Sequence, residues 1–363
     1  MAEEKIERIW YATERLYLKE PLKIANENYS FADTLLVFIK AGKFIGIGEA
    51  APDTEVTGET ISSVKSFIDN FSGELIGKSC NDIELINYTL RTHANKNPAA
   101  MAGIDIALYD LKGKVVERSL VYLLGGTGKE KQISVTIGIE NDKKAVIEAV
   151  RYKKLGFKII KVKVGLDLLK DLERVRRIRM AVGNGVLIAI DANQGYTVNQ
   201  SLEFLQIAEN YNILFLEQPL DKKDLSGMSY LRKNSSIPIM ADESVQTLKD
   251  LQRIIAKNAA DMINIKLMKM GGITRSLELY NVAIKNNLKV MVGCMEESRI
   301  GIAAGTVFAL SIKDIGFADL DSHLSHSNKL VRSGISTKMG RNILSGGNGL
   351  GLKLNQIVLK SYR

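Results

Sequence analysis

The sequence has 363 residues, of which 45% are hydrophobic and 25% charged, enough to bury the core of a barrel-sized domain and of a smaller one. Its 50 Lys and Arg residues exceed its 41 Asp and Glu residues, giving a net charge of +9, but the basic residues are scattered among acids and do not indicate nucleic-acid binding. Cys80 and Cys294 lie far apart without metal-type spacing, and neither a signal-peptide core nor a membrane span is present, so we expect a soluble, cytoplasmic protein.

Residues 1–125 predict an α+β domain. A strand is expected over 6–18, and the apolar segments 34–40 and 44–49 flank an Ala-Gly turn, which is typical of a hairpin. Helical spacing of apolar residues then predicts helices over 62–75, 82–91 and 99–116. Gly125-Gly126 ends this region, and we place the domain boundary there.

Residues 126–345 alternate short apolar strands with amphipathic helices, which is typical of βαβ units and a parallel sheet. The expected strands are 133–139, 159–164, 187–192, 213–217, 237–241, 262–267, 290–294 and 316–321. Eight strands with seven clear helices favour a modified TIM barrel of the (β/α)7β kind. An open doubly wound sheet is the alternative, and the lack of a Gly-rich phosphate turn makes it less favourable. The glycine-rich segment 346–351 lies past the last strand, in a return segment spanning 346–363.

The segment 158–165 places two ammonium groups on one face of an expected strand. Lys161 and Lys163 are two residues apart and so point the same way, opposite to the apolar residues between them. An unpaired buried ammonium is costly, so a core strand gains nothing from inward lysines unless a partner needs them. An amphipathic strand with a solvated lysine face is the alternative that this segment alone leaves open.

Charged residues follow five successive strands at nearly equal intervals. Reading the C-terminal strand ends in order gives Lys163, Asp191, Glu217, Asp242 and Lys266, each 24 to 28 residues after the one before. In a barrel these ends meet at one mouth. Three adjacent carboxylates repel one another unless they share a cation, and oxygen ligands suit a hard divalent ion, so the spacing predicts a Mg²⁺ site.

Two further polar residues stand beside the predicted metal ligands. Asn193 and Glu243 are expected to hold the ligands in place by hydrogen bonds, although capping of a loop or helix would explain them equally well. The site suits removal of a proton next to a carboxylate, because a cation can stabilise the resulting enediolate and a lysine near other cations can act as the base. Two lysines on opposite sides of the mouth predict racemisation or epimerisation.

At these residues the chain resembles the enolase superfamily, its muconate-lactonising-enzyme subgroup, and within it the dipeptide epimerases such as L-Ala-D/L-Glu epimerase. The motifs that carry the resemblance are Lys161-Val-Lys163, Asp191-Ala-Asn193, Glu217-Gln-Pro219, Asp242-Glu-Ser244 and the strings 264–272 and 293–301. The resemblance implies an N-terminal capping domain, completed by the C-terminal tail, over a (β/α)7β barrel. It also implies a homo-oligomer.

The resemblance implies a role for each site residue. Asp191, Glu217 and Asp242 would bind Mg²⁺, and Lys163 and Lys266 would be the acid/base pair. Lys161 would neutralise the substrate carboxylate, whereas Lys269 matches a non-catalytic position. Substrate-binding positions also include Thr136 and Ser298.

The eighth strand bears on the choice of reaction. Asp319 and Asp321 resemble the Asp-x-Asp pair with which dipeptide epimerases hold the substrate α-ammonium, although such pairs can also be mere caps. Muconate cycloisomerases, o-succinylbenzoate synthases and N-acyl amino acid racemases, the alternative functions, act on substrates without that group. A barrel that binds ligand without catalysis is a third hypothesis. After Asp321 the sequence departs from the family pattern, and we expect His323 and His326 on a surface loop.

Substrate choice is expected to depend on the loops at 23–32 and 51–59. Glutamate-specific relatives carry an arginine in the first loop, where an ungapped comparison places Glu27 in this chain, and a one-residue slip would place Asn26 or Asn28 there. A carboxylate at this position would repel a second acid, so we expect neutral or cationic dipeptides in preference to Ala-Glu.

Overall fold

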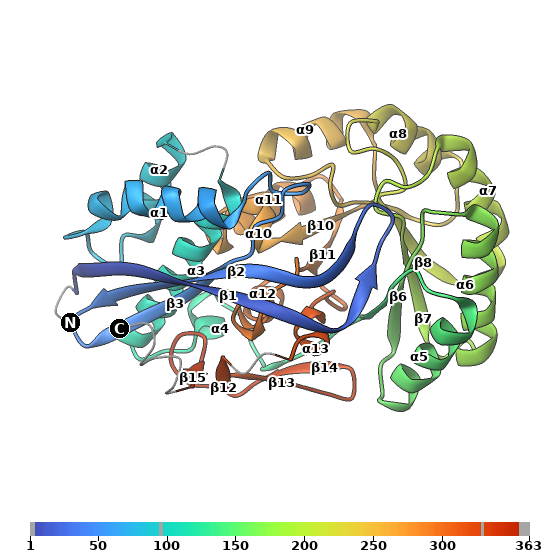
Figure 1. Ribbon diagram of the computed structural model, residues 1–363. Helices are drawn as coiled ribbons and strands as arrows, with labels where there is room; N and C mark the ends of the chain where they lie inside the picture. The colour runs from blue at the N-terminus through green and yellow to red at the C-terminus, as the bar shows by residue number, and fades with distance from the viewer. Residues whose placement is uncertain (1–3, 94–96, 328–329, 356–363) are drawn as a thin grey trace.

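The computed structural model describes residues 4–93, 97–327 and 330–355. Its N-terminal part is an antiparallel sheet covered by helices on one side (Figure 1). The strands pair in chain order and are β1 (Ile6–Lys23), β2 (Asn28–Ala41) and β3 (Phe44–Ala50). The helices are α1 (Ile61–Leu75), α2 (Ile83–His93), α3 (Pro98–Val115) and α4 (Leu120–Leu123).

Strand β2 is buried on both faces. Leu35, Val37 and Ile39 belong to a hydrophobic cluster with residues of α1, α2 and α3. Leu36 and Phe38 point the opposite way and join the cluster that packs the outer faces of the barrel strands against the barrel helices. Because successive strand residues face opposite sides, one apolar run serves both cores.

The second part of the chain is a parallel sheet rolled into a barrel with helices outside it (Figure 1). Its strands, each hydrogen-bonded to the next, are β5 (Val135–Ile137), β6 (Ile159–Lys163), β7 (Leu187–Asp191), β8 (Ile213–Glu217), β9 (Ile239–Ala241), β10 (Met262–Lys266) and β11 (Lys289–Gly293). The eighth strand is reduced to two parallel bridges, from Ala318 to Ile133 and from Asp319 to Gly293, and these join the first and last strands. The predicted (β/α)7β fold is confirmed.

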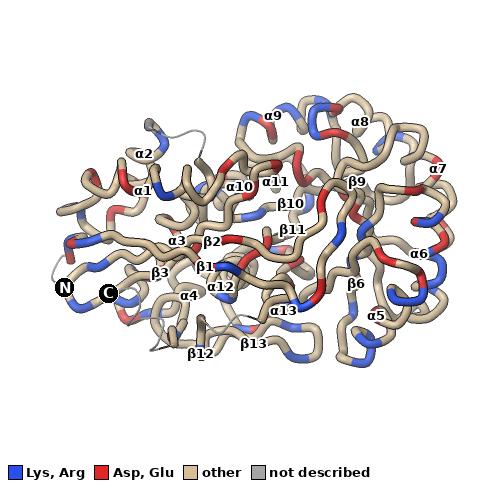
Figure 2. Tube along the Cα trace, in the orientation of Figure 1, with Lys and Arg blue, Asp and Glu red and all other residues tan. Residues whose placement is uncertain are grey.

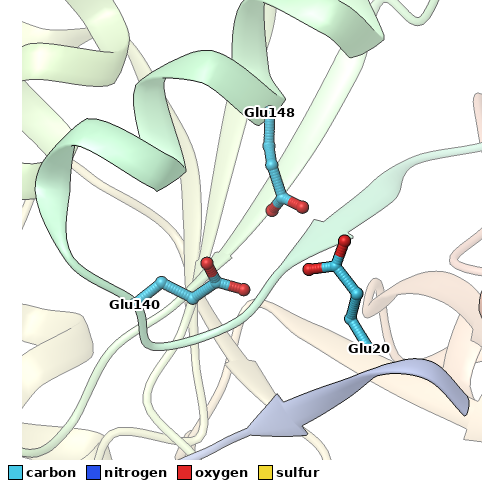
Figure 3. Close-up of side chains that lie close together, drawn as sticks. All are labelled: Glu20, Glu140 and Glu148. Atoms are coloured by element: carbon cyan, nitrogen blue, oxygen red, sulfur yellow. The ribbon is translucent and has the colours of Figure 1, made fainter.

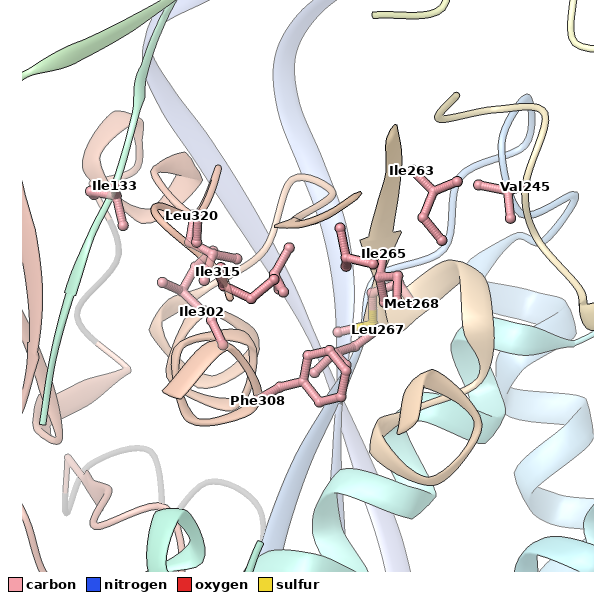
Figure 4. Packing of buried hydrophobic residues seen from close by; sticks show 14 of the residues in the cluster. Ile133, Val245, Ile263, Ile265, Leu267, Met268, Ile302, Phe308, Ile315 and Leu320 are labelled. Atoms are coloured by element: carbon pink, nitrogen blue, oxygen red, sulfur yellow. The ribbon is translucent and has the colours of Figure 1, made fainter. Parts of the chain in front are cut away.

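The elements that alternate with these strands are mostly amphipathic helices. They are α5 (Asp142–Lys154), α6 (Leu168–Val182), α7 (Val198–Ala208), η1 (Glu209–Tyr211), α8 (Leu225–Lys233), α9 (Leu248–Lys257), α10 (Leu267–Met270), α11 (Ile273–Lys285), α12 (Arg299–Ser311) and α13 (Ser322–Ser325). Figure 4 shows the side chains of α12, such as Ile302 and Phe308, packed with residues near β10 and the eighth strand. Among the described residues, no helix is long and apolar enough to cross a membrane.

The segment after the barrel packs back against the N-terminal helices. Its strands, together with one that precedes the barrel, are β4 (Glu130–Gln132), β12 (Val331–Ser333), β13 (Ile335–Lys338), β14 (Arg341–Leu344) and β15 (Lys353–Leu354). Gly349 O accepts a hydrogen bond from Leu120 N at 2.8 Å, and Asp110 Oδ1 on α3 accepts one from Leu350 N at 2.8 Å. Gly349 has a φ of +63°, and a Cβ there would lie 2.3 Å from Asp110 Oδ1, so the contact requires glycine.

Candidate active site

The C-terminal ends of the barrel strands open into a cavity of about 1320 Å³, which is also lined by the tip of the β1–β2 hairpin, between Lys19 and Asp33, and by the segment between Pro52 and Ile61. The predicted site residues that line it are Glu27, Thr136, Lys161, Lys163, Asn193, Glu243, Lys266, Asp319 and Asp321. Basic and acidic residues are interspersed along the trace, with no long run of one sign (Figure 2).

The face of β6 that points away from the core cluster carries the two lysines. Ile160 and Val162 are buried in that cluster, whereas Lys161 and Lys163 point into the barrel mouth. Lys161 is 2% exposed, and its Nζ lies 2.8 Å from each of three carboxylates, those of Asp191, Glu217 and Asp319. Lys161 therefore has the partners that a buried ammonium requires, which excludes the solvated lysine face.

Lys163 is held in a hydrogen-bond network at the end of β7. Its Nζ donates to Asp191 Oδ2 at 2.7 Å and to Asn193 Oδ1 at 2.9 Å. Asn193 Nδ2 donates to Glu243 Oε1 at 3.1 Å, and its backbone N donates to Asp191 Oδ1 at 3.0 Å. Asn193 thus links a lysine, a predicted metal ligand and Glu243.

Lys266 lies on the other side of the mouth, beside Asp242. The two groups form an ion pair of 2.8 Å. Burial opposes charging of Lys266, but the attraction of Asp242 outweighs it and raises the pKa of Lys266. Lys269 donates to the same carboxylate and to Asp242 O at 2.6 Å, so it positions Asp242 from behind.

Asn264 holds Glu217, a role that the sequence interpretation missed. Its Nδ2 donates to Glu217 Oε1 at 2.7 Å, and both side chains are fully buried. Asn264 lies two residues before Lys266 on β10, so the alternation of strand side chains could have indicated that it points into the same lumen.

The residues present fit a divalent cation. Asp191, Glu217 and Asp242 offer only oxygen atoms, which Mg²⁺ prefers, and each is at most 1% exposed. Burial raises the pKa of Glu217 to about 7, and the charges of Asp191 and Asp242 add to this rise. Glu217 Oε2 makes an ion pair with Lys161 but no hydrogen bond. A shared cation would relieve the repulsion among these carboxylates.

A different acidic group is more tightly clustered. Within the described ranges, the three acids whose ligand atoms all lie within 4.8 Å of one another are Glu20, Glu140 and Glu148, at the edge of the cavity (Figure 3). Lys144 Nζ lies 2.6 Å from Glu20 and 2.9 Å from Glu140, and so already neutralises part of this charge. The predicted metal ligands do not form so tight a group, and each of them is paired with at least one lysine.

The acids of the eighth strand lie side by side but differ in their partners. Asp319 accepts hydrogen bonds from Ser134 Oγ at 2.7 Å and from Lys161 Nζ at 2.8 Å. Burial opposes ionisation of Asp319, but the attraction of Lys161 outweighs it and lowers the pKa. Asp321 accepts one hydrogen bond from Thr136 N at 2.7 Å, and burial and the charge of Asp319 raise its pKa to about 7. Asp321 therefore has capacity to accept a cationic partner.

Glu27 lies in the loop that covers the site. Asn26 Nδ2 donates to Asn193 O at 2.9 Å, which ties this loop to the residue that holds Lys163. Glu27 is half-buried, and its pKa is raised by burial and by the charges of Asp53 and Glu55. These three acids line the same cavity as Lys163 and give it a negative wall.

Ser298 lies outside the cavity lining, in contrast to the predicted substrate contact. It is the N-cap of α12, and its Oγ donates to Glu49 Oε2 at 2.6 Å. Glu49, at the end of β3, also accepts from Ser298 N and Gly301 N at 2.8 Å each. This buried carboxylate therefore fastens the N-terminal domain to a barrel helix, an interaction that spacing could not reveal. His323 and His326, expected on the surface, are likewise buried.

Glu297 is a second buried carboxylate near Glu49, and we expect it to make stability depend on pH. Burial and the charge of Glu49 raise its pKa to about 8, against about 4.3 in an unfolded chain. Between these values the folded state holds a proton that the unfolded state has lost. Stability should therefore fall as pH rises, by at most about 1.4 kcal/mol per pH unit. Urea unfolding between pH 5 and 9 measures this slope.

The Glu297→Gln variant should flatten this part of the stability profile, because the neutral amide mimics the protonated acid. The exposed Glu74→Gln is the matched control and should keep the wild-type slope. An unchanged slope in Glu297→Gln would mean that Glu297 is ionised in the folded protein.

Comparison with known proteins places this architecture in a family. The family model described as "Mandelate racemase / muconate lactonizing enzyme, N-terminal domain" matches residues 7–125, and "Enolase C-terminal domain-like" matches 144–358. A hydrophobic dipeptide epimerase from Enterococcus faecalis is 35% identical over 353 residues, covering 97% of this chain and 99% of the relative. An L-Lys-D/L-Arg epimerase from Desulforapulum autotrophicum is 34% identical over 352 residues, covering 96% of this chain and 99% of the relative.

The fold agrees equally well. The crystal structure of the dipeptide epimerase from Enterococcus faecalis V583, complexed with Mg and the dipeptide L-Leu-L-Tyr, matches with a TM-score of 0.93 at 34% identity, covering 96% of this chain and 99% of that one. Sequence and fold thus match over nearly the whole chain, and the predicted resemblance is confirmed. The chain belongs to the enolase superfamily, in the mandelate racemase / muconate lactonizing enzyme group.

Proposed function

We propose that this protein is a Mg²⁺-dependent dipeptide epimerase, an isomerase that inverts the α-carbon of the C-terminal residue of an L,L-dipeptide. The placement of Lys163 and Lys266 carries this proposal. They end the second and sixth of eight barrel strands, so they lie on opposite sides of one mouth, with the carboxylate-bearing strands β7, β8 and β9 between them. Two amines on opposite sides can serve both faces of one carbon.

The chain's own residues account for binding and proton transfer. Asp319 and Asp321 hold the substrate α-ammonium, and Lys161 meets its carboxylate. One lysine, as the neutral amine, takes the α-proton, and the electron pair of the broken C–H bond moves into the carboxylate to give the enediolate. The opposite lysine, as the ammonium, returns a proton to the other face. Asp191, Glu217 and Asp242 would hold Mg²⁺, which when bound supplies positive charge that stabilises the enediolate oxygens.

Exchange with solvent tests this function. Pools of L,L-dipeptides incubated with the protein and Mg²⁺ in D₂O should gain one dalton at the α-carbon of the C-terminal residue, together with inversion. Turnover of N-acylated amino acids without any effect on free dipeptides would contradict the proposed function and favour a racemase of the same group. Homo-oligomer formation stays an expectation, which sedimentation velocity tests.

Glu27 should select against acidic substrates. Relatives of about 35% identity include epimerases named for hydrophobic and for Lys/Arg dipeptides, so family membership leaves the side chain open. Because Glu27, Asp53 and Glu55 line the same wall, we expect kcat/KM for L-Ala-L-Lys and L-Ala-L-Leu to exceed that for L-Ala-L-Glu by about tenfold or more. Glu27→Arg should raise relative activity on L-Ala-L-Glu.

The matched control is Asn28→Arg, which adds a positive charge at an exposed position of the same loop. It should shift the preference much less than Glu27→Arg. Comparable turnover of L-Ala-L-Glu and L-Ala-L-Leu by the wild-type protein would contradict the assigned role of Glu27.

A further inference from the structure

Helix α6 carries two buried arginines that bind backbone carbonyls at opposite ends of the barrel. Arg179 donates to Val186 O at 2.6 Å and to Tyr211 O at 2.8 Å, near the starts of β7 and β8. Arg174 donates to Glu140 O at 3.3 Å and to Lys163 O at 3.1 Å, beyond β5 and at the end of β6. Arg179 thus binds the backbone where two strands begin, whereas Arg174 binds the backbone carbonyl of the proposed base, Lys163.

Asp171 joins Arg174 to the turn that follows Lys163. It forms a buried ion pair with Arg174, and its Oδ2 accepts hydrogen bonds from Gly165 N and from Tyr196 OH, each at 2.8 Å. Arg174 therefore holds the carbonyl of Lys163, while Asp171 holds the N–H two residues later. Charge-assisted bonds of this kind fix orientation more strongly than neutral ones.

Close backbone packing leaves this turn little room to shift. Gly165 has a φ of +112°, and a Cβ on it would lie 2.5 Å from Ala192 O. A Cβ on Gly195 would lie 2.3 Å from Gly165 O. The turn after Lys163 is thus packed on one side against the loop after β7. On the other side it is hydrogen-bonded to the network formed by Asp171, Arg174 and Tyr196.

We propose that Asp171, Arg174 and Tyr196 form a positioning network that sets the reach of Lys163 while leaving Lys266 unaffected. This inference rests on the proposed two-base epimerisation. Lys266 ends β10, four strands away, where its ion pair is with Asp242. Weakening the network should therefore slow proton transfer at one face of the α-carbon only. A displacement of about 1 Å at a reacting group can cost about 100-fold in rate.

The test compares Arg174→Lys with Arg179→Lys, the same substitution on the same helix. Lysine keeps the charge but loses the planar fork that spans two acceptors. Both variants should lower the melting temperature. The decisive measurement is the initial rate of α-proton loss into D₂O, taken separately for the L,L- and L,D-dipeptides. Lys163→Ala identifies which epimer Lys163 serves, because exchange of that epimer is lost.

In Arg174→Lys, the exchange rate of the epimer served by Lys163 should fall by a factor at least about tenfold larger than the exchange rate of the other epimer. In Arg179→Lys, the exchange rates of both epimers should change by the same factor. Tyr196→Phe, which keeps the ring packed beside Phe204, should show the same asymmetry more weakly. Equal losses for both epimers in both network variants would overturn the inference while leaving the proposed epimerase intact. Absence of any exchange by the wild-type protein would overturn both.

Discussion

Replacing Lys163 or Lys266 with alanine is expected to abolish epimerisation while leaving solvent exchange at one epimer. Each lysine reaches one face of the α-carbon, so removal of either leaves an enediolate that can be reprotonated only from the side that lost its proton. General acid or base catalysis contributes about 10²- to 10⁴-fold, and we expect losses of this size in inversion. Polarimetry measures inversion, and mass spectrometry after incubation in D₂O measures exchange.

The two variants should differ in the epimer that still exchanges. Lys163→Ala should retain exchange of one epimer, and Lys266→Ala that of the other. Lys158→Ala, an exposed lysine just before β6, is the matched control and should behave as wild type. Full activity of either active-site variant in both directions would exclude the two-base mechanism.

Removal of Mg²⁺ should abolish activity, and readdition should restore it. Without the ion, the substrate carboxylate and the developing second charge would face three buried acids. Among the described residues, the charge of these acids is offset by Lys161, Lys163, Lys266 and Lys269. Binding of the ion should also stabilise the fold, by about 2.7 kcal/mol at a concentration 100 times the Kd. Calorimetric titration and thermal unfolding with and without Mg²⁺ measure these effects independently of turnover.

Glu217→Gln should weaken Mg²⁺ binding by about 100-fold or more, since it replaces a charged ligand that lies between the other two in the sheet. Glu209→Gln, a change of an exposed residue in η1 just before β8, should leave affinity unchanged. Wild-type affinity in Glu217→Gln would show that the ion binds elsewhere, and Glu20, Glu140 and Glu148 would then be the first group to test.

Much of the fold could be predicted because its elements repeat. Strand 213–217 was placed with its observed bounds, and the other barrel strands were placed within a few residues, since apolar runs separated by amphipathic helices leave few alternatives. The eighth strand was overestimated, because only Ala318 and Asp319 pair with its neighbours. The short strands after residue 330 were missed, since each has only two to four residues and shows no extended apolar alternation. One of them, β14, also pairs with β4, about 200 residues earlier in the sequence.

The site residues that could be predicted are those whose location follows from their place at the end of a strand. The predicted lysines, Asp319 and Asp321 line one cavity because parallel strands end at one mouth, and the predicted metal ligands lie buried beside them. Ser298 could not be placed, because capping a helix or lining a pocket depends on the direction of one side chain. Arg174 and Glu49 were missed because each binds backbone groups of another element, Lys163 O for Arg174 and Gly301 N for Glu49, and the residue type of the partner gives no sign of such a contact.

Strand β2 limits how substrate can enter. Its side chains are divided between the two hydrophobic clusters, with Leu36 and Phe38 on the barrel side. Swinging the capping domain away as a rigid lid would expose these two side chains to water, at a cost of about 3 to 6 kcal/mol. We therefore expect substrate to enter and leave past the segments around Asn26 and Asp53, so the residues expected to determine substrate choice would also lie along the entrance.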